Sequence, residues 1–502
     1  MSNKHPPSFI LAIDQGTTSS RAIVYRTSQA PTPCLEPIAS ACAEFPQHYP
    51  ENGWVEHQPN DLWQTAVDAC KQALRHADID AKQLVGIGIT NQRETTLVWE
   101  RASGTPVYPA IVWQDRRTAP MCKALRAEGH ADLIHERTGL LRDPYFSATK
   151  IRWILDNVPG AQQQAERGEL CFGTVDSYLL WRLTNGEVHA TDASNASRTL
   201  LMNLASVTWD QDLLSLFKIP LSMLPDIHDN TSNFGHTCAS ILGHSVPILA
   251  MVGDQQGALI GQACVQPGML KSTYGTGCFA LLHTGTQPLH SAHRLLATLA
   301  YRIDGTAYYA LEGSIFMAGA IIQWLRDSLG VLATAAQSEP LAQDVPYSQS
   351  EVLIPAFTGL GAPYWDPDAR AALFGMTRDT GPKQIAAAAL KSVALQSHDL
   401  LNAMVEDGQQ IHTLRVDGGM TENNWFLQAL SDLTGYPVER AQISEATALG
   451  AAFLAALHAD IFTSMDDMQT LHRINGTFEP KLSAAERSQL QQHWLAMVAK
   501  VR

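Results

Sequence analysis

Residues 14–21 combine glycine, hydroxyl side chains and an arginine, which are the materials of a phosphate-binding turn. They read Asp-Gln-Gly-Thr-Thr-Ser-Ser-Arg and separate two short apolar runs. Backbone N–H groups and hydroxyls in such a turn can bind phosphate oxygens, with Arg21 supplying a positive charge and Asp14 facing a metal ion beside the phosphates. A polar hairpin in which the Asp and Thr side chains only satisfy the turn is the alternative interpretation.

Two further carboxylates follow apolar runs. Asp254 comes directly after residues 250–253 and can serve as a general base, although Asp is also a favoured helix cap. Asp417 precedes two glycines between a predicted strand and a predicted helix, where a ligand can approach the backbone and the helix N-terminus favours an anion. A plain connection between strand and helix explains the second motif equally well.

Other chemical motifs are weaker or absent. Arg93 and Glu94 are adjacent opposite charges after a predicted strand, and such pairs usually lie on a solvated loop. The 18 histidines show no metal-ligand spacing, so we expect no zinc site. The GxxxxGK[ST] and GxGxxG sequences are missing, which argues against a P-loop and against a dinucleotide oxidoreductase.

The apolar pattern predicts two hairpins that position the glycine-rich turns. Residues 9–13 and 22–25 predict the first, and residues 269–273 and 278–282 predict a second with a similar Gly-Thr tip. Two such units about half a chain apart indicate two related domains.

Helices and further strands are predicted between and after the hairpins. Asn60 can cap a helix whose apolar positions are Leu62, Trp63, Ala66, Val67, Cys70 and Leu74. Pro382 lies in the first turn of a second helix, Thr421 can cap a third, and Ser483 with Glu486 has the spacing of a capping box. Buried strands are predicted at residues 84–90 and 414–416. This alternation predicts an α/β protein with largely parallel sheets, divided at residues 253/254.

The composition of the 502-residue chain limits the classes of protein it can be. With 45% hydrophobic and 17% charged residues, it fits an ordinary globular protein and not a disordered chain or a fibre. Its net charge of −14 disfavours binding to nucleic acid or to an anionic membrane. There is no run of about 18 apolar residues, and no secretion core follows the polar first eight residues. The eight cysteines form no CxxC pair, and we expect reduced, buried thiols in a cytoplasmic protein.

Seven motifs occur in a fixed order along the chain. They are DQGTTSSR (14–21), TNQRET (90–95), DPYFS (143–147), GDQQ (253–256), TYGTGCF (273–279), GLGAPYWD (359–366) and VDGG (416–419). This ordered set resembles the FGGY family of carbohydrate kinases, and within it the members that phosphorylate glycerol, over essentially the whole chain from about Phe9. The resemblance implies an α/β fold of two actin-like, RNase H-like domains with a cleft between them. Residues 1–253 would bind the polyol and the phosphates, and residues 254–502 the nucleotide.

The resemblance also implies roles for individual residues. Glycerol would be bound by Arg93, Glu94, Tyr145, Asp254 and Gln255, with Trp113 and Phe279 as an apolar wall against its carbon atoms. Asp254 would be the general base when ATP phosphorylates glycerol to sn-glycerol 3-phosphate. ATP or ADP would contact Thr17, Thr18, Ser19, Arg21, Thr276, Gly319, Gln323, Gly419 and Asn423. Mg²⁺ would bridge ATP oxygens and reach Asp14 and Asp254 through water. Self-association as a dimer or tetramer is expected, since relatives form both.

Residues 235–247 depart from a regulatory loop that some bacterial members carry. They lack its Gly-Gly-Lys-Gly-Gly run and its Arg, so we expect neither fructose 1,6-bisphosphate in the familiar site nor a phosphohistidine switch. Two other functions stay open: a kinase for another polyol or a ketose, and a catalytically silent, actin-like protein that binds ATP. The set Arg93, Glu94, Trp113, Tyr145 and Phe279 favours glycerol over the first. Retention of that set and of the base Asp254 argues against the second.

Overall fold

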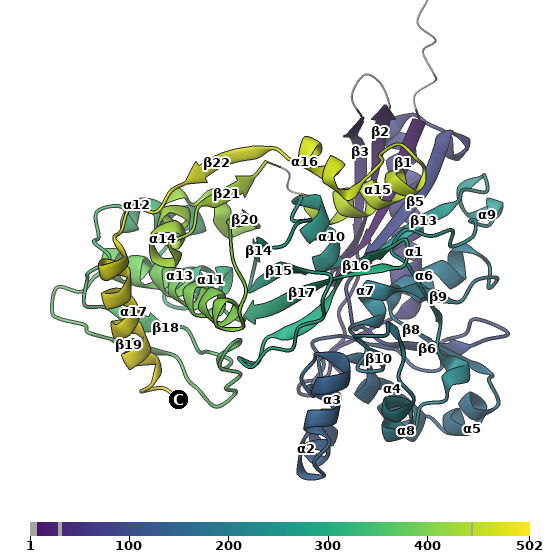
Figure 1. Ribbon diagram of the computed structural model, residues 1–502, viewed down its shortest axis with the longest axis horizontal. Helices are drawn as coiled ribbons and strands as arrows, with labels where there is room; N and C mark the ends of the chain where they lie inside the picture. The colour runs from purple at the N-terminus through teal and green to yellow at the C-terminus, as the bar shows by residue number, and fades with distance from the viewer. Residues whose placement is uncertain (1–7, 29–32, 443–444) are drawn as a thin grey trace, which may run out of the picture.

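The computed structural model contains two large mixed β-sheets with helices packed around them (Figure 1). It describes residues 8–28, 33–442 and 445–502. Of the eight N-terminal residues for which we expect no secretion signal, the first seven lie outside these ranges.

The first sheet has five strands in the order β13-β5-β1-β2-β3. They are β1 (Ser8–Gln15), β2 (Ser19–Ser28), β3 (Cys34–Glu44), β5 (Leu84–Asn91) and β13 (Ile248–Gly253). β1 and β2 form the predicted antiparallel hairpin, while β5 runs parallel to β1 and β13 runs parallel to β5.

This sheet is buried on both faces. Leu11 and Ile13 of β1 enter a core with α1 (Pro59–Ala77), whereas Ile10 and Ala12 enter a core with α10 (Asp254–Gly261) and α15 (Ala446–His458). Burial of alternate residues in two different cores explains why the strand is an uninterrupted apolar run.

The second sheet has seven strands in the order β16-β17-β15-β14-β20-β21-β22. They are β14 (Met269–Tyr274), β15 (Cys278–Gly285), β16 (Leu296–Ile303), β17 (Thr306–Ile315), β20 (Thr413–Asp417), β21 (Val438–Ala441) and β22 (Ile474–Phe478). β14 and β15 form the second predicted hairpin, and β20 runs parallel to β14.

The two sheets repeat one topology. The order β21-β20-β14-β15-β17 matches β13-β5-β1-β2-β3 in sequence of strands and in their directions, which confirms the prediction of two related domains. Only two strand pairs in each of these sheets are parallel, so the prediction of largely parallel sheets is wrong. Alternation of strands and helices does not fix the direction of the hairpin strands, which pair antiparallel because their connections are short.

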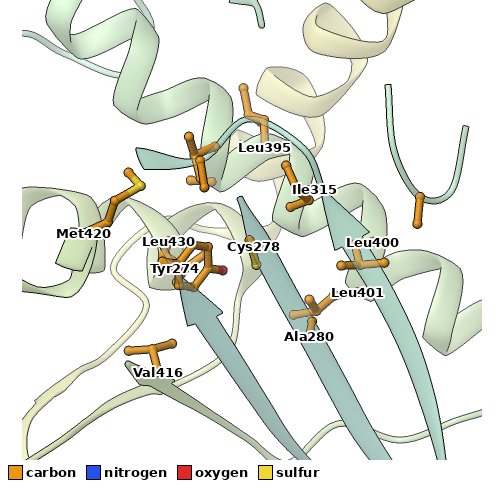
Figure 2. Packing of buried hydrophobic residues seen from close by; sticks show 14 of the residues in the cluster. Tyr274, Cys278, Ala280, Ile315, Leu395, Leu400, Leu401, Val416, Met420 and Leu430 are labelled. Carbon is orange, nitrogen blue, oxygen red and sulfur yellow. The ribbon is translucent and has the colours of Figure 1, made fainter. Parts of the chain in front are cut away.

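Helices cover the second sheet on the side shown in Figure 2. α13 (Pro382–Glu406) begins at Pro382 as predicted, and α14 (Asn424–Thr434) follows β20. Leu395, Leu400 and Leu401 of α13 share one buried cluster with Cys278 and Ile315 of the sheet (Figure 2).

Two of the predicted helix caps are wrong. α1 begins at Pro59 with Gln58 as its N-cap, so Asn60 lies inside the first turn, where proline had already fixed the start. A 3₁₀ turn (Gly419–Glu422) precedes α14, and Asn423 caps that helix by accepting the Phe426 N–H at 2.8 Å. The capping box before α17 (Ala484–Val498) is confirmed.

α10 and α15 lie between the two sheets and join them (Figure 1). A Cβ atom added at Gly261 would lie 1.9 Å from the Ala446 carbonyl oxygen, and one at Gly450 would lie 2.0 Å from that of Gly257. The backbones of the two helices therefore approach closer than any side chain would allow. α15 comes late in the chain yet packs on the first sheet, and the division at 253/254 stays a prediction.

The remaining helices and short strands complete the two halves. They are β4 (Glu56–His57), β6 (Leu97–Glu100), β7 (Ala110–Ile111), α2 (Ala119–Ala127), α3 (Ala131–Thr138), α4 (Ser147–Asn157), α5 (Ala161–Glu166), β8 (Leu170–Gly173), α6 (Val175–Leu183), β9 (Ala190–Asp192), α7 (Ala193–Ala196), β10 (Met202–Asn203), β11 (Thr208–Trp209), α8 (Gln211–Phe217), β12 (Asp226–His228), α9 (Ala239–Leu242), α11 (Gly319–Asp327), α12 (Ser338–Ala342), β18 (Val352–Ile354), β19 (Ala372–Phe374) and α16 (Met468–Leu471).

Two further expectations concerned the cysteine thiols and the absence of a membrane-spanning segment. All eight cysteines are free and five are buried, while Cys34 and Cys238 are half-buried and Cys42 is exposed. Within the described ranges, no helix combines the length and the apolar character needed to cross a bilayer.

Candidate active site

Three parallel strands of the first sheet end side by side and bring the predicted catalytic residues together. Asn91 of β5 pairs in register with Gly253 of β13, and Asp14 of β1 pairs with Thr90. Arg93 and Asp254 follow these strand ends, and Arg93 Nε lies 3.1 Å from Asp254 Oδ1. The carboxyl ends of parallel strands are the usual place for ligands in α/β sheets.

Asp254 occupies the first position of α10 and remains accessible. Its side chain is 31% exposed, and Oδ1 also accepts the Gln255 N–H at 2.7 Å. Burial raises the pKa of Asp254 above its ordinary value, and the charges of Arg93 and Lys271 oppose that rise. A carboxylate with a raised pKa is better matched to accepting a proton near neutral pH.

Two further buried charges, Arg198 and Glu312, pair with Arg93 and Glu94. Arg93 Nη1 donates to Glu312 Oε2 at 2.6 Å, and Arg198 bridges Glu94 Oε1 and Glu312 Oε1, each at 2.7 Å. The interpretation of Arg93 and Glu94 as a solvated loop pair is therefore wrong, because both side chains are buried.

Arg198 and Glu312 are not among the residues predicted from the sequence. Glu312 did carry a signal, since it is a lone charge in the apolar stretch 309–313, but Arg198 had none.

Aromatic side chains form one wall of the site. The Trp113 ring packs edge-to-face with Tyr145 and Phe279, at centroid separations of 5.6 and 6.3 Å. Phe279 belongs to β15 of the second sheet, so the wall draws on both halves of the chain. Trp113 and Phe279, the two residues predicted to form an apolar wall, thus lie together, and Tyr145, predicted to bind glycerol, packs beside Trp113.

Gln255 and a buried lysine lie at the junction of the two halves. Lys271 Nζ, on β14, donates to Gln255 Oε1 at 2.6 Å. Burial lowers the pKa of Lys271, while the charges of Asp417 and Asp254 raise it. In the sequence, Lys271 was one residue of the hairpin strand predicted at residues 269–273, and no chemical role was predicted for it.

The predicted phosphate turns are exposed at their tips. Thr18 is exposed on the first hairpin, and Gly275 and Thr276 are exposed on the second. The Thr17 backbone carbonyl accepts a hydrogen bond from Gln47, and Ser19 is half-buried beside it.

Arg21 makes an ion pair with Glu445, which precedes α15. The cation expected at the phosphates thus already has a carboxylate partner from the other half of the chain.

The predicted nucleotide residues of the second half gather at one edge of its sheet. Gly319 begins α11 and donates its N–H to the Gly275 carbonyl at 2.8 Å, and Gln323 is exposed on the same helix. Thr273 pairs with Asp417, so the turn that contains Gly419 lies beside the second hairpin. The Asn423 side chain accepts the Phe426 N–H and donates to the Ser338 hydroxyl, so it already has partners within the protein at the start of α14.

Asp14 and Asp254 are chemically suited to a divalent cation. Burial, the Asp254 charge and the Glu445 charge raise the pKa of Asp14 to about 7. A hard cation nearby would relieve this repulsion, and Mg²⁺ prefers a few carboxylates together with water and phosphate oxygens. In the described part of the chain, no cluster of three or more His, Cys, Asp and Glu side chains forms a complete metal site.

Known protein families match nearly the whole chain. The FGGY family of carbohydrate kinases matches through its N-terminal domain at residues 9–261 and through its C-terminal domain at residues 270–459. The chain is 54% identical to the glycerol kinase of Ectopseudomonas mendocina over 495 residues, covering 98% of this chain and 99% of the relative. It is 55% identical to glycerol kinase 1 of Pseudomonas aeruginosa, with the same coverage.

Solved structures share the fold. The crystal structure of Plasmodium falciparum glycerol kinase with ADP aligns at a TM-score of 0.93 and 34% identity, covering 99% of this chain and 98% of that one. Gluconate kinase from Lactobacillus acidophilus aligns at a TM-score of 0.89 with the same coverage, but at 20% identity it demonstrates likeness of fold alone.

Proposed function

The chain belongs to the FGGY family of carbohydrate kinases, and we propose that it transfers the terminal phosphoryl group of ATP to glycerol, giving ADP and sn-glycerol 3-phosphate. The observation that carries this proposal is the convergence of Arg93, Glu94, Asp254 and Gln255 beside an aromatic wall. We further propose that it works in the cytoplasm as a homodimer or homotetramer.

The polar residues of the site match the hydroxyls of a small polyol. An ionised Glu94 only accepts hydrogen bonds and Arg93 only donates them, while the Gln255 amide does both. Trp113 and Phe279 would pack against the carbon atoms. A site built in this way rejects analogues that lack a hydroxyl, because buried polar groups would then stay unpaired.

Asp254 is the proposed general base. Arg93 and the Gln255 N–H both contact Oδ1, so we assign Oδ2 to the terminal hydroxyl of glycerol. That hydroxyl oxygen would bond to the γ-phosphorus as the bond to ADP breaks, and its proton would pass to Asp254. A positioned base of this kind contributes about 10²–10⁴-fold to the rate, and the rest comes from positioning and charge neutralisation.

The two glycine-rich hairpins would hold the nucleotide. We assign phosphate contacts to Thr17, Thr18, Ser19 and Arg21 on the first side, and nucleotide contacts to Thr276, Gly319, Gln323, Gly419 and Asn423 on the second. Asp14 and Asp254 would hold Mg²⁺ through water, and the ion would neutralise charge on the phosphates. Closure of the two halves around both substrates would exclude water, which otherwise competes as phosphoryl acceptor.

ADP release by the purified protein with Mg-ATP tests the substrate. The acceptors are glycerol, erythritol, xylulose, ribulose, gluconate and none. Turnover mainly with glycerol is expected. Preference for a pentulose or gluconate would overturn the substrate assignment while leaving the nucleotide site intact. ATP binding without turnover on any acceptor would favour the silent ATP-binding protein instead.

A further inference from the structure

We propose that Arg198 and Glu312, which do not contact the reacting atoms, are positioning residues that fix Arg93 and Glu94 for polyol recognition. The inference rests on the proposed function for the identity of the substrate. It assigns part of the polyol specificity to β17, a strand of the half expected to bind the nucleotide.

The four side chains form a continuous chain of contacts. Each carboxylate oxygen of Glu312 accepts from a different arginine: Oε1 from Arg198 at 2.7 Å and Oε2 from Arg93 at 2.6 Å. Arg198 Nε donates to Glu94 at 2.7 Å, and Arg93 Nε lies 3.1 Å from Asp254. Glu312 thereby connects two residues of the candidate site through the guanidinium groups of the two arginines. These residues are Glu94, which would accept hydrogen bonds from glycerol, and the proposed base Asp254.

All four side chains are removed from water. Their exposed fractions are 0% for Arg198, 1% for Glu312 and 2% for both Arg93 and Glu94. Replacing one member of such a set leaves an uncompensated buried charge on its partner. The set therefore tolerates little rearrangement, which is what a site of fixed donors and acceptors requires.

The backbone holds Glu94 in an uncommon conformation that the network complements. Glu94 has φ of 60°, in the left-handed region that non-glycine residues rarely adopt. Its carbonyl oxygen accepts hydroxyl hydrogen bonds from Thr96 at 3.0 Å and Ser147 at 3.1 Å. The main chain is thus fixed by these hydroxyls, and the direction of the carboxylate is fixed by Arg198.

Arg198 is itself rigidly placed. Its guanidinium lies over the Phe146 and Tyr145 rings, at 5.3 and 5.8 Å from their centroids. It follows α7, which Asp192 caps, and Asn195 of that helix exchanges two hydrogen bonds with Asn91 at the end of β5. The arginine is therefore tied to the strand end that carries Arg93 and Glu94.

The two arginines of the network also oppose protonation of Glu94. Burial raises the pKa of Glu94, and Arg93 and Arg198 oppose that rise. Glu312, Tyr145 and Lys150 are the other titratable groups that interact with it. Without the Arg198 cation, the pKa of Glu94 rises further, so a smaller fraction stays an acceptor-only carboxylate near neutral pH.

The test compares two buried arginines in matched settings. Arg198→Met and Glu312→Gln probe the network, and Arg117→Met is the control. Arg117 is likewise buried, paired with Asp115 and Glu56 at 2.8 Å each, and stacked over the rings of Trp54 and Trp153. Values of kcat and KM for glycerol and for ATP are measured on the full chain between pH 5.5 and 9.

The expected signature is selective for the polyol. KM for glycerol rises roughly tenfold or more in Arg198→Met and Glu312→Gln, while KM for ATP changes by less than about twofold. In Arg198→Met, the acid limb of the pH profile of kcat/KM for glycerol moves to higher pH. In Arg198→Lys, the limb returns part of the way to its original pH. When Glu94→Gln is also present, Arg198→Met no longer moves the limb. Arg117→Met leaves both KM values and the limb in place.

Three results would overturn the inference: equal losses for both substrates, an unmoved acid limb, or the same profile in Arg117→Met. If Arg198→Met does not fold, Arg198→Lys is measured instead. A rise of KM for glycerol relative to KM for ATP then supports the inference, and an unchanged ratio of the two KM values overturns it. Failure of the proposed function is recognised separately, because it appears as a different preferred acceptor in the unmodified protein.

Discussion

The indole Nε1–H of Trp113 donates a hydrogen bond of 3.0 Å to the hydroxyl of Thr17. Trp113 belongs to the aromatic wall of the candidate polyol site, and Thr17 belongs to the first glycine-rich hairpin. The candidate polyol site and the candidate phosphate turn are thus joined by a hydrogen bond between their own side chains.

Replacing Trp113 with phenylalanine tests this link. Trp113→Phe keeps an aromatic face beside Tyr145 and Phe279 but removes the donor to Thr17, a loss of about 1 kcal/mol for a neutral hydrogen bond. We expect KM for ATP to rise by about fivefold, in addition to any change for glycerol. Steady-state kinetics with each substrate varied would check it, and an unchanged KM for ATP would argue against the coupling.

Asp254→Asn tests the general base. The amide keeps the shape and an oxygen for Arg93, but it cannot accept the proton of the attacking hydroxyl. We expect kcat to fall by about 10²–10⁴-fold with the fold and much of the glycerol binding retained. Circular dichroism and glycerol titration serve as controls, and near-normal turnover would remove Asp254 from the base role.

Two adjacent glycines should respond oppositely to alanine. Gly418 has φ of 93°, and a Cβ there would lie 2.5 Å from the Tyr274 carbonyl oxygen, whereas a Cβ at Gly419 meets nothing within 4 Å. We expect Gly418→Ala to lower the free energy of unfolding by about 1–3 kcal/mol. Gly419→Ala should change it by less than about 0.5 kcal/mol but raise KM for ATP, because a nucleotide would approach that backbone. Similar denaturation curves for the two variants would contradict this account.

Asp399 of α13 should make stability depend on pH. The buried carboxylate accepts hydrogen bonds from the Tyr364 hydroxyl at 2.7 Å and the Trp494 indole at 2.6 Å, and burial raises its pKa to about 7 from 3.8. The folded state therefore retains a proton that the unfolded chain releases above pH 4. This contribution is fully present below pH 4 and is lost as the pH rises to 7, by about 4 kcal/mol at most.

Asp399→Asn mimics the protonated acid at every pH and should remove that slope. Denaturant unfolding of both proteins between pH 4 and 7.5 measures the difference. We expect the variant to gain stability relative to the unmodified protein as the pH rises, and two parallel curves would show that Asp399 does not titrate as described.

Local features of the fold were largely predictable because they depend on near neighbours in the chain. Both hairpins, the β5 and β20 strands, the start of α13 and the capping box before α17 follow from apolar spacing and turn residues. The cap predicted at Asn60 was wrong because Pro59 starts α1 one residue earlier, after an N-cap that makes no side-chain hydrogen bond. The cap predicted at Thr421 was wrong because a 3₁₀ turn intervenes and Asn423 caps α14 instead.

The candidate site was predictable as a set of residues and not as a set of contacts. The ordered motifs pointed to Arg93, Glu94, Asp254 and Gln255. The linear sequence could not reveal that Arg93 contacts Glu312, which is 219 residues away. It likewise gave no signal for Arg198, since a buried arginine and an exposed one look the same in a sequence.

By itself, the sequence determined which chemical groups are present, their order and the short-range elements that carry them. Only the tertiary structure decided that α15 returns to the first sheet, that Glu445 pairs with Arg21, and that four charges share one buried network. These pairings depend on packing between remote elements, which brings strand ends into register. Where this packing excludes water, a buried charge is stable only if an opposite charge or a hydrogen-bond partner lies within a few ångströms.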